Sequence, residues 1–263
     1  MAQKIRGLEI FGQHFSEFRD QYVLIGGVAS WLTMDEAGES FRATKDLDIV
    51  LVIEALNTEF VEAFWDFIRA GGYAIKQVGG GGVEGQGRPV FYRFQNPEDE
   101  VYPVQIELFS RAPEGIEHPE HATLTPIPTD ESVSSLSAIL LDDPYYHFLL
   151  EGRHSNEELT FIGADRLIPL KAHAWLDLSA RKQAGEQVDS KSIRKHRNDV
   201  LQLSGQLTDD PVALPESIQT DMRAFLELLA KEEIDLKAID LRGTLEDYIE
   251  RLASSFGLQH PSQ

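Results

Sequence analysis

The fold is decided by residues 44–50, which read Thr-Lys-Asp-Leu-Asp-Ile-Val. Branched apolar residues dominate this stretch and continue to Ile53, so we expect a central, buried strand. Side chains alternate between the two faces of a strand, so Asp46 and Asp48 should point to the same face. Two carboxylates held side by side repel each other unless they lie at an exposed strand end or share a cation. Because Mg²⁺ prefers oxygen ligands and completes its shell with water and substrate phosphates, the pair is a candidate metal site. Asp-x-Asp pairs also occur on solvated strands, so neighbouring features have to distinguish a metal site from a solvated strand.

A glycine pair upstream supports the metal-site interpretation. Gly26 and Gly27 follow the apolar run 22–25, which predicts a buried strand that ends in a tight turn. A helix that contains Ser30 is expected directly after this turn. Backbone amides at a helix start, with no side chain in the way, suit an anionic phosphate group. The alternative is an ordinary strand-to-helix turn.

Three further residues could complete the site. Arg42 and Thr44 precede the acidic pair and supply a cation and a hydroxyl, although a surface loop could carry the same residues. Glu107 lies within the otherwise apolar stretch 105–108. A lone buried carboxylate is costly unless it is paired or coordinated. Glu107 therefore needs a partner, a metal ion or an exposed place at a strand end.

The hydrophobic pattern predicts an α/β fold followed by a helical region. Strands are expected at 22–25, 47–53, 73–77, 89–94 and 104–109, and short apolar runs that can extend the sheet lie at 137–141, 145–150 and 159–162. Helices are expected at 3–19, from Ala29 onwards, and at 58–70, 165–184, 189–204, 216–231 and 243–255. We therefore expect a mixed sheet packed against helices in a first domain, residues 1–163, and a helical second domain, residues 164–263.

Composition limits the range of functions. The chain has 263 residues, no cysteine and a formal net charge of −20. Absence of cysteine excludes disulfides, thiolate metal sites and thiol catalysis. No apolar run is long enough to span a membrane, and the N-terminus lacks the apolar core of a signal peptide, so we expect a cytoplasmic protein without a membrane partner.

The strong acidity is unsuited to non-specific binding along a nucleic-acid backbone. Residues 161–200 are the exception, with 8 Lys and Arg against 5 Asp and Glu. A solvated helix face explains this window as simply as a binding surface does.

The order of these blocks resembles the nucleotidyltransferase superfamily: a Gly-Gly turn, a helix, Asp-x-Asp on a strand, and a third carboxylate on a later strand. The closer likeness is to AbiEii-type proteins, the toxin components of abortive-infection toxin–antitoxin systems. The matching blocks are 26–29 (Gly-Gly-Val-Ala), 42–48 (Arg-Ala-Thr-Lys-Asp-Leu-Asp), 106–108 (Ile-Glu-Leu), 170–174 (Leu-Lys-Ala-His-Ala) and 194–201 (Arg-Lys-His-Arg-Asn-Asp-Val-Leu). The chain departs from that group at Gln105, where Lys is often seen, and at Asn198, where Arg is common.

The resemblance implies a nucleotidyltransferase fold, a mixed sheet with flanking helices, and a role for each block. Asp46, Asp48 and Glu107 would bind Mg²⁺ or Mn²⁺, and Glu107 could also activate an attacking hydroxyl. Two such ions could clamp an in-line phosphoryl displacement. The residues that contact the nucleotide would be Gly26, Gly27, Ser30, Arg42 and Thr44.

Two residues of the later helices complete the implied catalytic set. Lys171 would offset phosphate charge, and Asp199 would orient or deprotonate the acceptor. Each has a simpler explanation: Lys171 can be a solvated helix residue, and Asp199 can be the i,i+4 partner of Lys195.

The activity implied by the resemblance is Mg²⁺-dependent transfer of a nucleoside monophosphate from an NTP to an RNA or protein acceptor. A toxin of this kind would also have an antitoxin partner. A second hypothesis is a protein of the same fold that binds a nucleotide or a partner without catalysis. A third is a small-molecule transferase of the antibiotic-modifying kind, whose acidic pocket would take a cationic substrate.

Two other features are weaker candidates. The glycine-rich stretch 79–87 lacks the Lys-Ser/Thr ending of a P-loop and predicts a hairpin loop. His118 and His121 lie in an acidic, irregular connection, where solvent exposure is a simpler explanation than metal binding.

Overall fold

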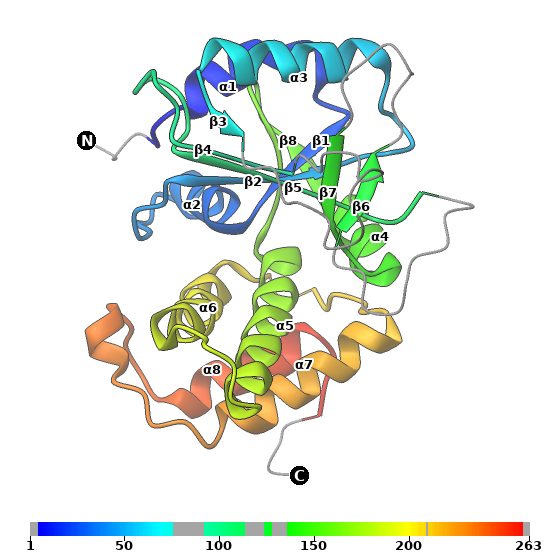
Figure 1. Cartoon of the computed structure of the whole chain (residues 1–263). Helices are drawn as coiled ribbons and strands as arrows, with labels where there is room; N and C mark the ends of the chain where they lie inside the picture. The colour runs from blue at the N-terminus through cyan, green and yellow to red at the C-terminus, as the bar shows by residue number, and fades with distance from the viewer. Residues whose placement is uncertain (1–4, 76–91, 114–123, 128–135, 209, 260–263) are drawn as a thin grey trace. The chain divides into compact units, whose positions relative to one another are not determined.

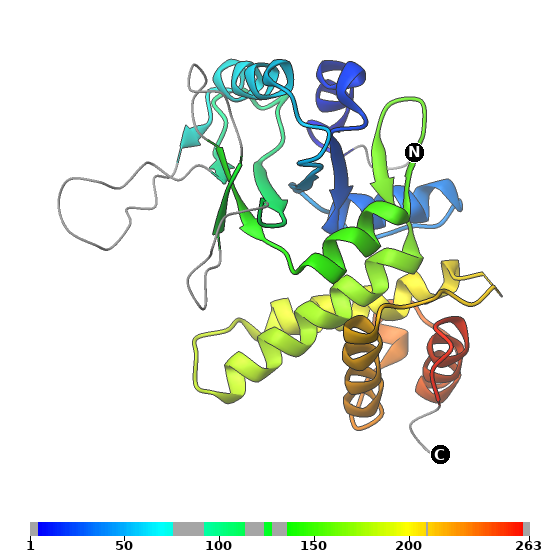
Figure 2. The same ribbon diagram turned by 90° about the vertical axis from the view of Figure 1, so that its right-hand side faces the viewer.

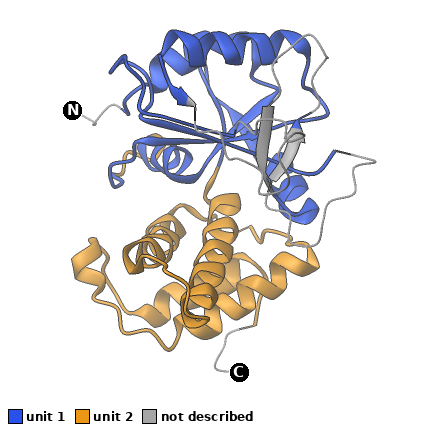
Figure 3. Ribbon diagram, in the orientation of Figure 1, with its two compact units in different colours: residues 1–35, 40–162 blue, residues 36–39, 163–263 orange. Residues whose placement is uncertain are grey.

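The chain forms two compact units in the computed structural model, which describes residues 5–75, 92–113, 124–127, 136–208 and 210–259 (Figures 1 and 3). Unit 1 comprises residues 1–35 and 40–162, and unit 2 comprises residues 36–39 and 163–263. The sequence places the boundary between residues 163 and 164. The predicted glycine-rich loop 79–87 and the histidines 118 and 121 lie outside the described residues.

Unit 1 is built on a mixed sheet, which confirms the predicted α/β class. Its main path runs β3-β4-β5-β2-β1-β9-β8. These strands are β3 (Ala74–Ile75), β4 (Arg93–Gln95), β5 (Gln105–Ser110), β2 (Asp46–Leu51), β1 (Tyr22–Ile25), β9 (Thr160–Ile162) and β8 (Arg153–Ser155). Off this path, β7 (Leu136–Leu140) pairs with β5 and with β6 (Leu124–Ile127). Strand β2 is parallel to β5 and antiparallel to β1.

Helices cover both faces of this sheet (Figures 1 and 2). On one face lie α1 (Leu8–His14) and α3 (Thr58–Ala70), and on the other lie α2 (Gly26–Glu36) and α4 (Asp143–Glu151). The α1/α3 face holds an aromatic core, in which ring contacts join Phe11, Phe15, Tyr22, Phe64 and Phe94. These residues are almost fully buried. Burial of such large side chains is the main favourable contribution to the stability of the unit.

Three local predictions are corrected by the structure. The helix expected at 3–19 ends at His14 and is followed by a short 3₁₀ turn, Ser16–Phe18. Helix α2 begins at Gly26 rather than at Ala29. The run 145–150, expected to extend the sheet, is part of helix α4.

The reason for the third correction lies in the residues just before that run. Asp142 is the N-cap of α4, and a proline follows in the first helical turn, where its missing N–H costs no hydrogen bond. The buried residues of α4 recur at helical spacing: Tyr145, Tyr146, Phe148 and Leu149.

Unit 2 is helical, as predicted. Its helices are α5 (Ala164–Gln183), α6 (Ser190–Leu203), α7 (Glu216–Leu229) and α8 (Leu245–Ser255), with short 3₁₀ turns at Ser204–Gln206 and Leu236–Ile239. Trp175 of α5 packs edge-on against Phe225 of α7, with ring centroids 5.3 Å apart. None of the helices in the described stretches combines the length and the apolar character that a bilayer-spanning segment needs.

Candidate functional site

The acidic pair of β2 lies in register with charged residues of two neighbouring strands. Asp48 pairs with Glu107 on the parallel strand β5, and Glu107 pairs with Arg93 on the antiparallel strand β4. Residues paired across a sheet point to the same face. Three charged side chains therefore form one row across β2, β5 and β4.

A second polar row lies two residues away on each strand. Asp46 pairs with Gln105, and Gln105 pairs with Gln95. The Gln95 Nε2 group donates a hydrogen bond to Gln105 Oε1. Phe94, the residue between the two rows on β4, packs against Phe64 of α3. Alternation along the strand therefore places both polar rows on the sheet face opposite α1 and α3.

The glycine turn lies directly against this site. Gly26 has a left-handed backbone with φ of 66°, and a Cβ atom added there would lie 2.0 Å from Asp48 Oδ2. A Cβ atom on Gly27 would lie 2.4 Å from Thr44 Oγ1 and 3.8 Å from Arg42 Nη2. The left-handed backbone favours glycine at residue 26, and the close approach of neighbouring side chains leaves no room for a Cβ atom at either position. The structure thus brings together these five residues, which the sequence assigned to one site.

Helix α2 begins at Gly26, so its first backbone amides lie beside the acidic strand. The first N–H groups of a helix have no intrahelical acceptor and are available to an anion. Ser30 is fully buried, and its hydroxyl donates to the Gly26 carbonyl oxygen at 2.6 Å. In this arrangement Ser30 stabilises the turn from within the helix.

Glu107 has a partner that the sequence analysis missed. Its side chain is 14% exposed and forms an ion pair with Arg93, whose side chain is 34% exposed. This pairing meets the need for a compensating charge that a carboxylate within an apolar strand creates. A signal for it exists in the sequence: Arg93 is a lone cation between Tyr92 and Phe94, just as Glu107 is a lone anion between Ile106 and Leu108.

The carboxylates of β2 are better suited to hold one cation with two protein ligands than to form part of a site with three or more protein ligands. In the described part of the chain, no group of three or more His, Asp or Glu side chains is arranged to hold a metal ion. Asp46 and Asp48 are both partly exposed and share a face. Mg²⁺ is commonly held by one or two carboxylates together with substrate phosphates. The two aspartates fit such an ion, and the third place assigned to Glu107 stays a prediction.

The remaining predicted catalytic residues belong to unit 2. Lys171 of α5 donates to Asp199 Oδ2 of α6 at 2.7 Å, and the two side chains are 4% and 1% exposed. The solvated position considered for Lys171 is therefore wrong. The carboxylate of Asp199 is bound by this distant lysine, and the catalytic roles of the two residues stay predictions.

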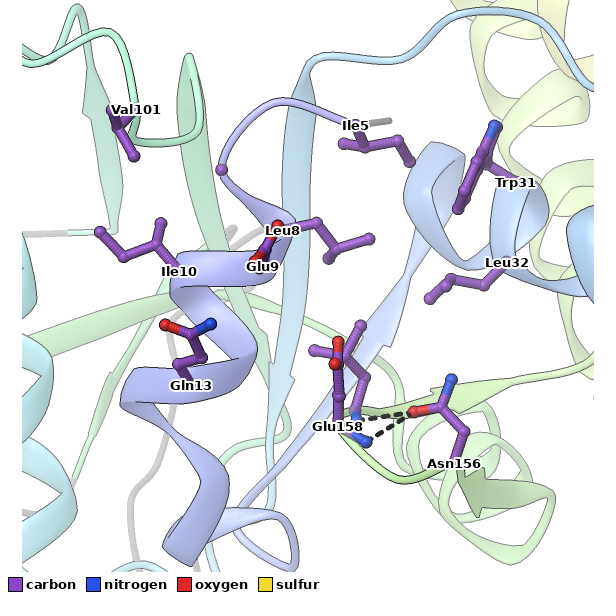
Figure 4. A pocket seen from close by; sticks show the side chains of 12 residues that line it. Ile5, Leu8, Glu9, Ile10, Gln13, Trp31, Leu32, Val101, Asn156 and Glu158 are labelled. Carbon is purple, nitrogen blue, oxygen red and sulfur yellow. Dashed lines mark hydrogen bonds between the residues drawn. The ribbon is translucent and has the colours of Figure 1, made fainter. Parts of the chain in front are cut away.

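A pocket of about 710 Å³ lies elsewhere in unit 1 (Figure 4). Side chains of α1 and α2, among them Leu8, Trp31 and Leu32, form its apolar lining. At its rim, Asn156 Oδ1 accepts the backbone N–H of Glu158 at 3.0 Å. The described residues that line this pocket include none of the predicted site residues.

Comparison with known proteins gives a distant likeness at the level of structure. No protein-family model matches the chain, and no curated protein matches its sequence. Among solved structures, the chain is similar to an antigenic nucleotidyltransferase-like protein from Paracoccidioides brasiliensis, at 15% sequence identity and a TM-score of 0.46, over 88% of this chain and 89% of that chain. Likeness at this level says nothing about the substrate of this chain.

Proposed function

We propose that the chain is a Mg²⁺-dependent nucleotidyltransferase: an acceptor hydroxyl forms a bond to the α-phosphorus of an NTP, the bond between the α- and β-phosphates breaks, and pyrophosphate and the hydroxyl proton are released. The observation that carries this proposal is the close approach of the Gly26–Gly27 turn to Asp48 and Thr44. It sets a helix start, which suits phosphate, beside a pair of carboxylates, which suits Mg²⁺. A Mg²⁺–NTP complex needs both kinds of group in one place.

Each group has a defined task in this proposal. Asp46 and Asp48 hold the cation, and the first amides of α2 bind phosphate oxygens. Arg42 adds positive charge beside Gly27. When bound, the cation neutralises charge on the transferred phosphoryl group and orients it for in-line attack.

The choice of acceptor rests on the resemblance of the sequence blocks to those of AbiEii-type proteins. They support an RNA or protein acceptor and a toxin that has an antitoxin partner. Expression of the chain in a bacterial host tests the toxin assignment: growth should stop with the wild-type chain and continue with Asp48→Asn. If the wild-type chain does not affect growth, the toxin role is contradicted. The transfer reaction is tested separately, with labelled NTPs.

A second candidate is a protein that binds Mg²⁺ and an NTP without transferring it. Two ion pairs favour it, since Glu107 is bound by Arg93 and Lys171 by Asp199. Because of these ion pairs, Glu107 is poorly placed to act as a base and Lys171 to contact phosphate. Calorimetry would then show binding of Mg²⁺–NTP, while no labelled product would form.

The deciding experiment incubates the chain with each of the four NTPs, labelled at the α-phosphate, in the presence of Mg²⁺ and RNA, protein or aminoglycoside acceptors. Transfer to one class of acceptor, lost in Asp48→Asn, supports the enzyme. The matched control is Asp66→Asn, an exposed residue of α3 whose carboxylate pairs with Arg69. The control should retain wild-type transfer. Absence of both transfer and Mg²⁺–NTP binding in the wild type would contradict both candidates.

A further inference from the structure

Strand β5 lies between the acidic strand β2 and the strand β4, and the side chains of Gln105 and Glu107 engage β4. Glu107 forms its ion pair with Arg93, and Gln105 accepts a hydrogen bond from Gln95. Each of these two contacts joins residues that are direct partners in the β4–β5 register. Two successive contacts therefore bind the polar face of β5 to β4.

We propose that Arg93 withholds Glu107 from the metal site, so that the chain binds one divalent cation, on Asp46 and Asp48, rather than two. The inference rests on the proposed function, because it concerns the cation of the same site. It makes Arg93 a positioning residue that sets the number of metal ions.

The position of Glu107 in the sheet makes this competition direct. Arg93 and Asp48 are its register partners on either side. Adjacent strands lie about 4.8 Å apart, so a glutamate side chain can reach toward either neighbour. The guanidinium group attracts the carboxylate, and the carboxylate of Asp48 repels it. Both effects favour the observed pairing with Arg93.

Burial strengthens the preference. With 14% of its side chain exposed, Glu107 interacts with Arg93 in a medium less polar than water, where the attraction is larger. Movement of Glu107 to a metal ion would leave the guanidinium group without this carboxylate, next to the added positive charge of the ion. Arg93 thus compensates Glu107 in the way that a second cation otherwise would.

The test counts bound Mn²⁺ on the whole chain by electron paramagnetic resonance, in which binding removes the signal of the free ion. Sites that persist in Asp46→Asn/Asp48→Asn are subtracted, because an acidic surface also attracts Mn²⁺. We expect one specific ion for the wild type. In Arg93→Met, Glu107 is released, so we expect two ions and a spin-coupled Mn–Mn signal. The control Gln95→Leu breaks the neighbouring contact without releasing a carboxylate and should keep one ion.

The double variant Arg93→Met/Glu107→Gln separates this idea from a three-carboxylate site. It removes the ion pair without a change of net charge. We expect one ion, with an affinity within about threefold of the wild type, whereas loss of a true ligand should weaken binding about tenfold or more. This comparison holds even if Arg93→Met alone fails to fold.

Three results would overturn the inference: two specific ions in the wild type, one ion in folded Arg93→Met, or tenfold weaker binding in the double variant. The first two leave the proposed function standing, since a metal still binds the aspartates. No specific ion in the wild type would overturn the inference together with the metal dependence of the proposed function. Failure of one is thereby distinguished from failure of both.

Discussion

The buried ion pair of unit 2 gives the largest predicted effect on stability. Lys171→Met would leave the Asp199 carboxylate, 1% exposed, without the ammonium group that lies 2.7 Å away. Removal of one partner of a buried pair typically costs about 3–5 kcal/mol. Because native domains are stabilised by only about 5–15 kcal/mol, this variant should lose a large part of the stability of unit 2.

Trp175 offers a probe for this unit, since it is buried in α5 against Phe225. Substitution of Trp31 and Trp65, the other two tryptophans, with Phe leaves fluorescence from unit 2 alone. In urea, a loss of 3–5 kcal/mol should lower the unfolding midpoint by about 1 M or more, since the slope for small domains is about 1–3 kcal/mol per M.

The double variant Lys171→Met/Asp199→Asn is the matched control. It removes both charges, so no buried charge is left without its partner, and it should be more stable than Lys171→Met. A midpoint for Lys171→Met close to that of the parent chain, or a double variant less stable than Lys171→Met, would refute this role of the ion pair.

Two further predictions concern unit 1. Gly26→Ala should lose about 1–2 kcal/mol of stability from its left-handed backbone and more from contact with the nearby Asp48 carboxylate, and it should bind Mg²⁺ more weakly. The control Gly38→Ala lies in the segment 36–39 of unit 2, has φ of 75° and meets no neighbouring group among the described residues within 4 Å of its Cβ position, so it should show the backbone loss alone in thermal unfolding. Burial raises the pKa of Glu54, but hydrogen bonds from Tyr146 and Arg111 outweigh it and hold the pKa below its ordinary value of 4.5. The ionised carboxylate therefore stabilises the fold above pH 4.5, and this contribution is lost as the pH falls through the lowered pKa. Glu54→Gln should thus make the stability less dependent on pH when unfolding is measured between about pH 6 and pH 3. An unchanged pH dependence would contradict the assignment.

Local patterns in the sequence were sufficient to predict how the two aspartates of β2 are oriented. Alternation along a strand placed Asp46 and Asp48 on one face, and that relation holds within a single element. The glycine pair was predicted to form a tight turn before the helix, but both glycines are the first residues of α2, and of the two only Gly26 has a positive φ. Both predictions used neighbouring residues only. The structure agrees with the shared face of the two aspartates, whereas the start of α2 takes the place of the predicted turn.

Contacts between distant elements could not be derived in this way. The ion pair of Glu107 depends on the register between β4 and β5, which is fixed by packing of the whole sheet. The pairing of Lys171 with Asp199 depends on which faces of α5 and α6 meet. The strand predicted at 145–150 was wrong for a third reason, because a short apolar run fits a buried strand and a buried helix equally well.

The ion pair between Lys171 and Asp199 also gives a test of whether these two residues take part in nucleotide transfer. If Lys171 and Asp199 act only through stability, the double variant Lys171→Met/Asp199→Asn, once folded, should transfer the nucleotide at the wild-type rate. Transfer would then depend on groups of unit 1, chiefly Asp46, Asp48 and the start of α2. If the folded double variant still binds Mg²⁺–NTP but transfers no nucleotide, the result would instead support the catalytic roles that the sequence predicted for Lys171 and Asp199. Binding and turnover measured on this one variant therefore distinguish a structural ion pair from a catalytic one.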